Sequence, residues 1–411
     1  MKKIFIPIAA LLFIIFSIGY VNSLGQGIED TYASHEIMKW RDNRAAAVSV
    51  TFDDGYLSQA TTGANLLTAR NLQGTFFLVS SAQDTRWENW RQLAEQGHEM
   101  ASHTVTHLYL TTLSETELRQ ELSESQETIN LNIPTQSCLT FAYPYSDQNE
   151  FVQAITSEYY IAGRCTWTGT LNHYPGGPYD PINFFTIGSF CFDNASLEEV
   201  EYQLDQSEAL NAWFCVHMHG ITSEKANRLS QFLDELLTRN IWVDTLGTIV
   251  RYMREKIFST LTILSESSNE ITLDLTHPLN NDIYNIPLTI RSTVPLSWDE
   301  VEISQDESTF VIEPVIENNE AVVYYDAIPN AGLIILSPYN PSPYPFISVA
   351  PSSLSPSTTE GSDPPDQTFN VWNSGGGTLN YFISVSESWL SCSPASGTST
   401  GELDPITVSY S

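Results

Sequence analysis

The feature that most constrains the fold is a regular alternation of strand-like and helix-like segments between residues 45 and 256. Short apolar runs, typical of buried strands, are separated by longer segments whose apolar residues recur with a helical period. Ser114 and Ser196 stand at the expected N-cap positions of two of the helices. Repeated units of this length predict a parallel sheet or a barrel. The clearest strands are expected at residues 74–80, 139–145, 159–162, 212–219 and 241–246, and a helix over 87–96 is closed by Gly97.

One further strand ends in two adjacent carboxylates. Residues 48–53 alternate apolar and polar side chains, as in a pleated strand, and Gly55 lets the chain turn sharply. Asp53 and Asp54 are therefore expected at the C-terminal tip of this strand. Neighbouring carboxylates repel each other unless a cation or a shared proton holds them. A solvated turn is the simpler interpretation, and a second cluster of polar residues argues against it.

The second cluster is a pair of histidines, His103 and His107. On a helical turn, residues four apart lie on one face, so both imidazoles can hold one metal ion. Asp54 would add a carboxylate oxygen to the two nitrogens. Three protein ligands with open positions left over describe a catalytic metal site better than a closed structural one. Asp53 would then remain free to act as a base.

These two motifs resemble those of the polysaccharide deacetylases, carbohydrate esterase family 4. Thr-Phe-Asp-Asp-Gly stands at residues 51–55, and the His-Ser/Thr-x-x-His motif is matched at 103–107. The resemblance covers about residues 45–256. It implies an α/β fold with a distorted (β/α) barrel, and chemistry at the C-terminal ends of the strands. It also implies a divalent metal ion, with zinc as the expected metal, held by Asp54, His103 and His107.

The third motif departs from the family pattern. Many members carry Arg-x-Pro-Tyr, in which the arginine steadies the catalytic aspartate, whereas this chain has Ala142 in the place of the arginine. We expect Arg164, which follows the strand at 159–162, to replace the missing guanidinium and to keep Asp53 ionised. A surface arginine is the alternative. The resemblance also implies that Tyr145 offers its backbone N–H to a developing oxyanion.

A second pair of histidines lies in the strand expected at 212–219. His217 and His219 are two residues apart and therefore point to the same side of the strand. His219 is nearer to the C-terminal tip, and the resemblance makes it the acid that protonates the leaving amine or alcohol. His217 is expected to be a core histidine one layer below. The family's aspartate that orients the catalytic histidine is not recognisable around residues 165–167.

The N-terminus has the pattern of a signal peptide. Lys2 and Lys3 precede an apolar run over residues 4–18, and small residues follow up to Ser23. The run is short for a membrane span, which needs ~20 residues. We expect a signal peptide over residues 1–23, no membrane span after its cleavage, and a secreted or cell-envelope protein. An uncleaved N-terminal anchor is the alternative.

The chain is strongly acidic, with a formal net charge of −32. Such a charge argues against nucleic acid as a partner, because nucleic acids are bound by basic surfaces. It suits a soluble extracellular protein and neutral or cationic polymers. The partner that the resemblance implies is an acetylated polysaccharide, with N- or O-linked acetyl groups.

Five cysteines bear on the redox compartment. Four of them lie in the first domain, enough for two disulfides in an oxidising compartment, with three possible pairings. Cys392 would be left over. A zinc site made of cysteines is not expected, because no two stand at CxxC spacing. The four are Cys138, Cys165, Cys191 and Cys215.

A change of composition marks the end of the first domain. Sixteen of the 17 lysines and arginines lie at or before Lys256, and β-rich sequence full of Ser, Thr and Pro follows. We expect the barrel over residues 30–256, a β-sandwich over 258–342, and a second β-sandwich over 346–411. Since only a linker and one sandwich face are expected to join them to the barrel, the barrel is expected to be active alone.

The last segment resembles the BACON-type modules attached to secreted carbohydrate enzymes. The chain stops at Ser411 in a strand-like stretch, so a truncated module is one interpretation. The β modules are expected to contact glycan or the cell surface. Trp372 and Trp389 would stack on sugars in that case, and they would pack within the module if it is only a spacer.

The expected function is therefore a secreted, metal-dependent hydrolase that removes acetyl groups from an acetylated polysaccharide. Two alternatives remain open. A deacetylase-like barrel that has lost activity would present glycan to its β modules, and Ala142 and the missing fourth motif support it. The second alternative is hydrolysis of a small amide or imide on the same barrel, a reaction that some relatives perform.

Overall fold

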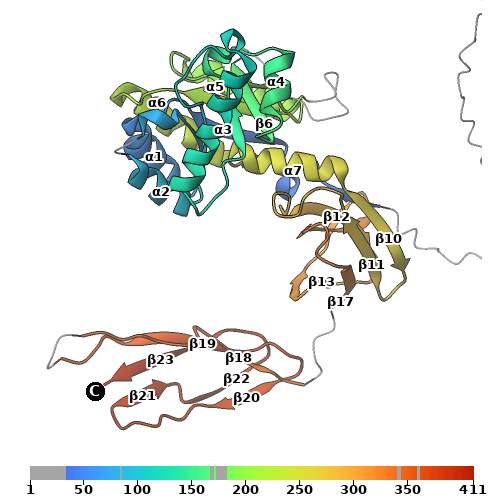
Figure 1. Ribbon diagram of the computed structural model, residues 1–411. Coiled ribbons are helices and arrows are strands. Elements are labelled where there is room, and N and C mark those ends of the chain that lie inside the picture. The colour runs from blue at the N-terminus through green and yellow to red at the C-terminus, as the bar shows by residue number, and fades with distance from the viewer. Residues whose placement is uncertain (1–33, 84–85, 167–170, 173–182, 340–343, 359–361) are drawn as a thin grey trace, which may run out of the picture.

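The computed structural model describes residues 34–83, 86–166, 171–172, 183–339, 344–358 and 362–411. Figure 1 shows a barrel surrounded by helices in the first part of this chain, a β module in orange after it, and another β module in red at the C-terminus. The order of these parts is the one expected from the sequence.

In the described part of the chain, seven parallel strands close into a barrel. Strand β2 (Ala46–Phe52) pairs with β3 (Thr75–Leu78) on one side and with β8 (Trp213–Met218) on the other, which closes the ring. The short strand β9 (Ile241–Val243) pairs with the first residues of β2. The distorted (β/α) barrel that the sequence predicts is therefore confirmed. The remaining strands of the ring are β4 (Glu99–Ser102), β5 (Thr140–Ala142), β6 (Ala162–Thr166) and β7 (Ile187–Cys191).

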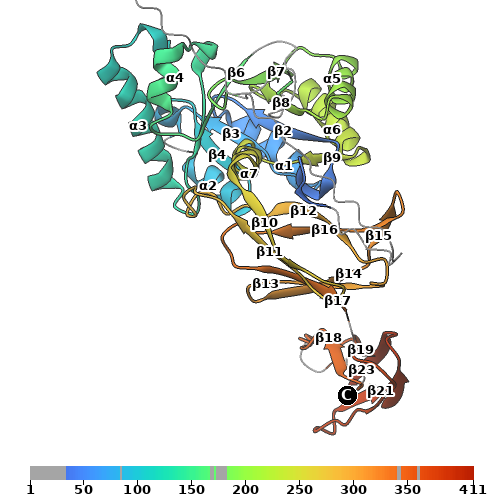
Figure 2. The same ribbon diagram turned by 90° about the vertical axis from the view of Figure 1, so that its right-hand side faces the viewer.

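Helices cover the outside of the barrel (Figure 2). The strand residues Val48, Val50 and Phe52 form one apolar cluster with helix residues such as Leu229 and Phe232. Ser114 and Ser196, both expected as N-caps from the sequence, form capping boxes that begin α3 and α5. The helices are α1 (Ala64–Thr68), α2 (Trp87–Glu95), α3 (Glu115–Asn132), α4 (Glu150–Thr156), α5 (Leu197–Ala209) and α6 (Ser223–Thr238).

The last helix of the barrel, α7 (Leu246–Phe258), closes one end of it. Its first backbone N–H groups donate to residues that begin two strands: Leu246 to Thr75 Oγ1 and Gly247 to Glu99 Oε2, both at 2.8 Å. We call this end, formed by the N-terminal ends of the strands, the closed end. The opposite end, formed by the C-terminal ends of the strands, is called the mouth.

The middle module packs against α7 (Figures 1 and 2). Within the described residues its strands form two antiparallel sheets, in the orders β1-β12-β16-β15 and β10-β11-β17-β13-β14. The bounds are β1 (His35–Ile37), β10 (Thr260–Glu266), β11 (Ile271–Thr276), β12 (Leu288–Val294), β13 (Val301–Gln305), β14 (Ser308–Ile312), β15 (Val315–Glu317), β16 (Glu320–Ala327) and β17 (Ile334–Pro338).

The boundary between barrel and middle module differs from the expected one in two ways. Residues 35–37, placed in the first domain by the sequence analysis, form β1 and pair with β12 of the middle module. In addition, one continuous buried cluster joins the inside of the closed end, α7 and both sheets of this module. Its members include Trp40, Phe77, Trp213, Leu246, Tyr252, Ile271, Ile290, Val323 and Leu336. The barrel and the middle module therefore share one core.

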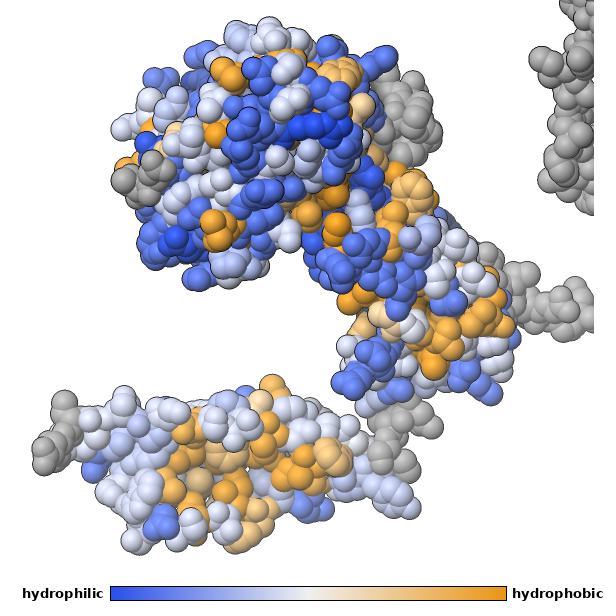
Figure 3. Space-filling view, in the orientation of Figure 1, coloured by the Kyte–Doolittle hydropathy of each residue, from blue (hydrophilic) through white to orange (hydrophobic). Residues whose placement is uncertain are grey.

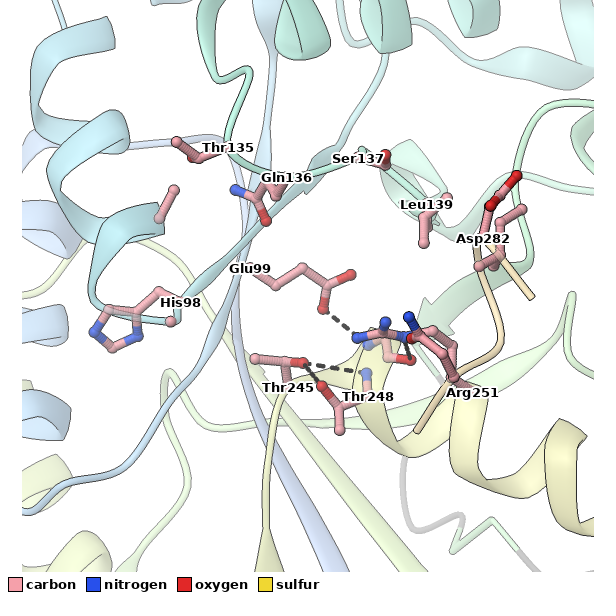
Figure 4. Close-up of a pocket in the computed structure, with 15 residues that line it drawn as sticks. His98, Glu99, Thr135, Gln136, Ser137, Leu139, Thr245, Thr248, Arg251 and Asp282 are labelled. Atoms are coloured by element: carbon pink, nitrogen blue, oxygen red, sulfur yellow. Dashed lines mark hydrogen bonds between the residues drawn. The ribbon is translucent and has the colours of Figure 1, made fainter. Parts of the chain in front are cut away.

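A cavity of about 420 Å³ opens where the closed end meets the middle module (Figure 4). Arg251 of α7, Asp282 of the middle module and the buried Glu99 are among its lining residues. The Glu99 carboxylate accepts hydrogen bonds from Thr75 Oγ1 at 2.8 Å and Thr140 Oγ1 at 2.6 Å, besides the bond from the start of α7. This carboxylate is thus used to tie two strands to α7, and the expected catalytic residues do not line the cavity.

The C-terminal module has a small core of its own, built around Val371 and Ile406. Apolar side chains gather on its surface in Figure 3. An apolar hollow of about 390 Å³ includes Trp389, which is 48% exposed and stacks on Tyr410 at 6.4 Å between ring centroids. One sheet contains β18 (Ile347–Ala350), β19 (Gln367–Asn373), β23 (Asp404–Tyr410) and β21 (Leu390–Ser393), and the other contains β20 (Leu379–Phe382) and β22 (Ser396–Ser399).

The cysteines do not form the disulfides that the sequence allows. All five lie within the described residues, and all are free. Cys215 lies inside the barrel, whereas Cys138 and Cys165 lie in the cluster between strands and helices, so the strands separate Cys215 from these two. None of the helices in the described residues is long and apolar enough to span a bilayer. The expected signal peptide, residues 1–23, lies outside the described residues.

Candidate active site

The two aspartates at the end of β2 have different neighbours because the chain turns between them. Asp54 has a φ of 75° and Gly55 a φ of 71°, both in the left-handed region. A Cβ on Gly55 would lie 2.6 Å from the side-chain nitrogen of Gln83, so only glycine fits this turn. As a result Asp53 stays inside the barrel, whereas Asp54 turns toward the loop that follows β4.

That loop carries the histidine pair, but not on a helical turn as the sequence analysis expected. Residues 103–107 form an irregular loop in which Thr104 and His107 have φ values of 68° and 63°. The carboxylate of Glu121 on α3 accepts the backbone N–H groups of the two residues after Thr104, each at 2.9 Å. The Thr104 hydroxyl accepts the backbone N–H of His107 at 2.8 Å. The spacing of four residues therefore predicted correctly that His103 and His107 lie close together. The helical turn that was expected to bring them together is wrong.

Asp54, His103 and His107 form a triangle of potential ligand atoms. Nε2 of His103 lies 3.6 Å and Nε2 of His107 3.4 Å from Oδ1 of Asp54, and the two nitrogens are 3.1 Å apart. Zinc bonds to histidine and carboxylate are about 2.0–2.2 Å long, so ligand atoms about 3–3.6 Å apart can share one ion. His103 Nδ1 lies 2.8 Å from the carbonyl oxygen of Ala142, which assigns it the proton and frees Nε2 for a metal. These residues fit one divalent cation.

Asp53 is buried beside this triangle and contacts Arg164. Nη2 of Arg164 donates to both Asp53 oxygens, at 2.5 and 2.6 Å, and the two residues are 5% and 2% exposed. Burial alone would raise the pKa of Asp53, but the charge of Arg164, with smaller contributions from nearby histidines, lowers that pKa to about 2.

Arg164 lies within a strand and not after one, as the sequence analysis had placed it. It belongs to β6 (Ala162–Thr166) and pairs with Ala142 of the neighbouring strand β5. Ala142 is the position where the family motif carries its arginine. The small side chain of Ala142 and the guanidinium of Arg164 therefore occupy adjacent positions inside the barrel, and the guanidinium comes from the next strand.

His219 lies at the mouth, directly after β8, the strand that pairs with β2, and is held by Asp193. Oδ2 of Asp193 is 2.5 Å from His219 Nδ1, and Oδ1 accepts the backbone N–H of His219 at 3.0 Å and Lys225 Nζ at 2.6 Å. The hydrogen bond to Asp193 raises the pKa of His219. The pKa of Asp193 is lowered well below its usual range by these hydrogen bonds, although burial opposes them.

Asp193 is the site residue that the sequence analysis missed. It follows β7 (Ile187–Cys191), a strand not recognised from its sequence Ile-Gly-Ser-Phe-Cys. The signal that could have found it is its position, a carboxylate directly after a strand of a barrel. Asp193 fills the place of the histidine partner that was left unassigned around residues 165–167.

Tyr145 lies at the mouth in the short turn Pro144–Ser146, because β5 ends at Ala142 and not at residue 145 as the sequence had suggested. It has a φ of 56° and is 57% exposed. Its ring meets the His107 ring edge-on at 4.6 Å and stacks on Tyr109 at 4.1 Å between centroids. The expected residues of the site, and Asp193, are thus brought together at one end of the barrel.

Comparisons with known proteins agree with this geometry. Residues 41–162 match the polysaccharide deacetylase family, and residues 346–411 match the viral BACON domain. The chain therefore contains a domain of the polysaccharide deacetylase family, followed at the C-terminus by a BACON-type domain.

Individual relatives are more distant. A gellan lyase from a Bacillus species is 26% identical over 352 residues, which cover 77% of this chain and 14% of the lyase. A chitooligosaccharide deacetylase from Sinorhizobium fredii is 29% identical over 102 residues, 25% of this chain and 47% of that protein. The chain thus spans less than half the length of either curated relative. The solved family 4 carbohydrate esterase from Streptomyces lividans is 16% identical, with a TM-score of 0.38, and the match covers 49% of this chain and 92% of the esterase.

Proposed function

We propose that this protein is a secreted or cell-envelope, metal-dependent hydrolase that removes acetyl groups from an acetylated polysaccharide. The family match supports the reaction class and a polysaccharide substrate. The observation that carries the proposal is a single site at the mouth. The triangle of Asp54, His103 and His107 lies beside the Arg164-bound Asp53, and the Asp193-bound His219 follows the neighbouring strand β8.

Asp54, His103 and His107 would hold the metal. A divalent cation there would supply Lewis acidity toward the acyl carbonyl and make a water molecule more acidic. Zinc is the expected metal, because two imidazole nitrogens and one carboxylate oxygen with open positions left over are typical of catalytic zinc. No other cluster of this kind occurs among the described residues.

Asp53 and His219 would move the protons. Asp53 is ionised at neutral pH because Arg164 stabilises its charge, so it can accept a proton from the attacking water. His219 gives Nδ1–H to Asp193, which leaves Nε2 to donate a proton to the departing amine or alcohol. Since Asp193 raises the pKa of His219, the donor form persists to higher pH. The backbone N–H of Tyr145 is proposed to donate to the oxyanion.

Arg164 also weakens the case for an inactive, purely glycan-binding barrel. That alternative rested on Ala142 and on the unrecognised histidine partner. Arg164 supplies a guanidinium to Asp53, and Asp193 supplies a carboxylate to His219. The gellan lyase gives no separate candidate function, because the match covers only 14% of that protein.

The test is release of acetate by the full chain from a panel of N-acetylated and O-acetylated glycans. Activity is expected with about one bound divalent ion per chain, with loss on exhaustive chelation and recovery on addition of Zn²⁺. The His103→Ala variant should bind no metal and release no acetate while it keeps its thermal melt. Acetate release that survives removal of all metal would contradict the proposal, as would a metal-loaded wild type that acts on none of the glycans.

A further inference from the structure

His217 has a polar environment that a simple core histidine would not need. It lies on β8, two residues before His219 and on the same face of the strand, and it is 3% exposed. In the strand register it stands between Thr51 of β2 and Cys191 of β7. His217 is therefore one layer inside the mouth, as the sequence predicts, directly below His219.

The hydrogen bonds of Ser189 determine which nitrogen of His217 carries the proton. The Ser189 hydroxyl donates its one proton to the carbonyl oxygen of Cys165 at 2.9 Å, since a carbonyl can only accept. It accepts from Nη1 of Arg164 at 2.7 Å, since a guanidinium can only donate. Only a proton on His217 Nδ1, donated to Ser189 Oγ at 2.9 Å, satisfies all three contacts of this hydroxyl at once.

Nε2 of His217 consequently carries no proton and can only accept a hydrogen bond. The ring is neutral, because burial and the neighbouring Arg164 lower the pKa of His217 to about 3. Among the described residues, no donor forms a hydrogen bond to Nε2. Nε2 is not sealed from solvent, so a ligand that enters the mouth can supply a donor to it.

The placement of the substrate indicates which part of it reaches this layer. The polysaccharide is too large to enter the barrel, so the leaving group lies at the mouth beside His219, whose side chain is 42% exposed. The three substituents of a carbonyl carbon lie about 120° apart. With the leaving group directed outward, the rest of the acyl group is directed inward, toward the layer of His217.

The wall of this layer is suited to a polar acyl group. Cys191 alternates with Ser189 along β7 and so faces the barrel interior from the strand next to His217. A thiol and an unprotonated imidazole nitrogen face the acyl group there, and no aliphatic side chain stands at either position. A methyl group gains little against such a wall, whereas a hydroxyl can donate to Nε2.

We propose that His217 is a specificity-determining residue whose Nε2 accepts a hydrogen bond from the acyl group, so that the site prefers an acyl group with a hydroxyl on the carbon next to the carbonyl, a 2-hydroxyacetyl group, to an acetyl group. This inference rests on the proposed function and narrows its substrate class. The hydrolysis is otherwise the same: water adds to the carbonyl carbon, the bond to the sugar nitrogen or oxygen breaks, and the hydroxy acid leaves.

The test compares kcat/KM for two forms of one amino-sugar oligomer, 2-hydroxyacetylated and acetylated. The wild type should favour the hydroxyacetyl form, and His217→Leu should lower the ratio of the two constants about tenfold, the range of one neutral hydrogen bond. His217→Gln, whose side-chain oxygen can take the place of Nε2, should restore part of the ratio. An unchanged ratio in an active His217→Leu variant would overturn the proposal.

A matched control separates specificity from stability. Thr51 is buried in the same layer, beside His217, and its hydroxyl donates to the carbonyl oxygen of Val216 at 2.8 Å. Thr51→Val should lower the melting temperature and leave the ratio unchanged, because the Thr51 hydroxyl donates to the backbone of β8 and not to an acyl group. A ratio that falls equally in both variants would show that the preference reports packing, and would overturn the role of His217.

A binding measurement keeps this inference separate from the proposed function. In an Asp53→Asn background, which should not turn over substrate, calorimetry would give Kd for both oligomers with His217 and with Leu at position 217. The hydroxyacetyl preference should again fall about tenfold in the double variant. A wild type that releases neither acid would contradict the proposed function, and the ratio of Kd values would still decide the role of His217.

Discussion

Two buried carboxyl groups, Asp53 at the mouth and Glu255 behind the closed end, have pKa values shifted in opposite directions. At the mouth, Asp53 is 5% exposed and bonds to Arg164, and its pKa is lowered to about 2. Behind the closed end, Glu255 of α7 is fully buried and accepts the backbone N–H of Ile286 at 2.9 Å. Its other oxygen lies 3.9 Å from His277 Nε2, beyond hydrogen-bond distance, and burial raises the pKa of Glu255 to about 7.

The difference shows that burial alone does not mark a catalytic carboxylate. Burial raises the pKa of both groups, and at Asp53 the charge of Arg164, with smaller contributions from nearby histidines, reverses that effect. A carboxylate that is ionised and close to potential metal ligands can accept protons from water. A carboxyl that is half protonated near neutral pH, between a helix and a β module, contributes mainly to the contact between them. The mouth therefore has the ionised carboxylate that the proposed chemistry requires, whereas the carboxyl behind the closed end lies where two modules join.

The largest expected effect comes from breaking the closed end. A chain that ends at Lys256 should fail to fold, because it exposes one side of the cluster that includes Trp213 and Tyr252. Each large apolar side chain that loses its burial costs about 1.5–3 kcal/mol, and a typical domain has only about 5–15 kcal/mol of stability in all. A chain that ends at Pro338, without the C-terminal module, should keep its melting temperature and its activity.

Circular dichroism melts and acetate release from both truncated chains would check this prediction. It replaces the expectation from sequence that the barrel is active alone. Cooperative melting and full activity of the chain that ends at Lys256 would show that the shared core is not needed.

The next effect separates the two carboxylates by activity. Asp53→Asn should lower kcat by about 10²–10⁴-fold, the usual contribution of a general base, while metal content stays the same. Glu255→Gln should leave kcat unchanged, because it lies behind the closed end. Single-turnover kinetics and elemental analysis of both variants would check the pair. Equal losses of kcat in the two variants would mean that neither loss reports base catalysis.

Much of the mouth could be predicted from the sequence because its residues follow strands. Asp53 and Asp54 stand after an alternating strand, and His219 stands after another, so the barrel rule places them together. The histidine pair was recognised by its spacing, although left-handed backbone at Thr104 and His107, and not a helix, brings it together.

The closed end could not be predicted in the same way. β1 is only three residues long, and it pairs with β12, which lies far along the chain. The sequence of β1 does not indicate this pairing. A periodic apolar pattern shows that a face of α7 is buried, but not that a β module covers it. Asp193 was missed for a related reason. The strand before it contains Gly188 and Ser189, so its apolar and polar side chains do not alternate clearly.

A smaller effect, on stability and on the pH dependence of the rate, should follow from removing the guanidinium of Arg164, which keeps Asp53 ionised. Arg164→Ala leaves Asp53 buried without a counter-charge, which typically costs about 3–5 kcal/mol of unfolding free energy. Because the folded pKa of Asp53 is depressed, its stabilising contribution is present above its unfolded pKa and is lost as pH falls through about 2. Without Arg164 the pKa of Asp53 rises, so the acidic limb of the pH–rate profile should move to higher pH.

Denaturant unfolding and a pH–rate profile would check this prediction, with Arg164→Lys as the matched control. The lysine keeps the positive charge but loses the second donor to Ser189, so its acidic limb should move less. An acidic limb that stays in place in Arg164→Ala would show that Arg164 does not set the ionisation of Asp53.

The smallest effect concerns the pH dependence of stability at Glu255. Its folded pKa of about 7 lies above the value of about 4.3 expected for an unfolded chain. Between these values the folded state binds more protons than the unfolded state, so this group makes the wild type less stable as pH rises from about 4.5 to 7. Glu255→Gln removes the titration and should be more stable than the wild type, by about 1–2 kcal/mol, above pH 7 and not at pH 4.5.

Urea unfolding of the wild type and Glu255→Gln at pH 4.5, 6 and 8 would measure this difference. Glu127→Gln, an exposed position on α3, removes one carboxylate from the same acidic chain and should change stability equally at all three pH values. If the curves of the wild type and Glu255→Gln ran parallel, Glu255 would have to be ionised throughout the range. The contrast with Asp53 would then lie in function alone, because both ends would hold a buried negative charge.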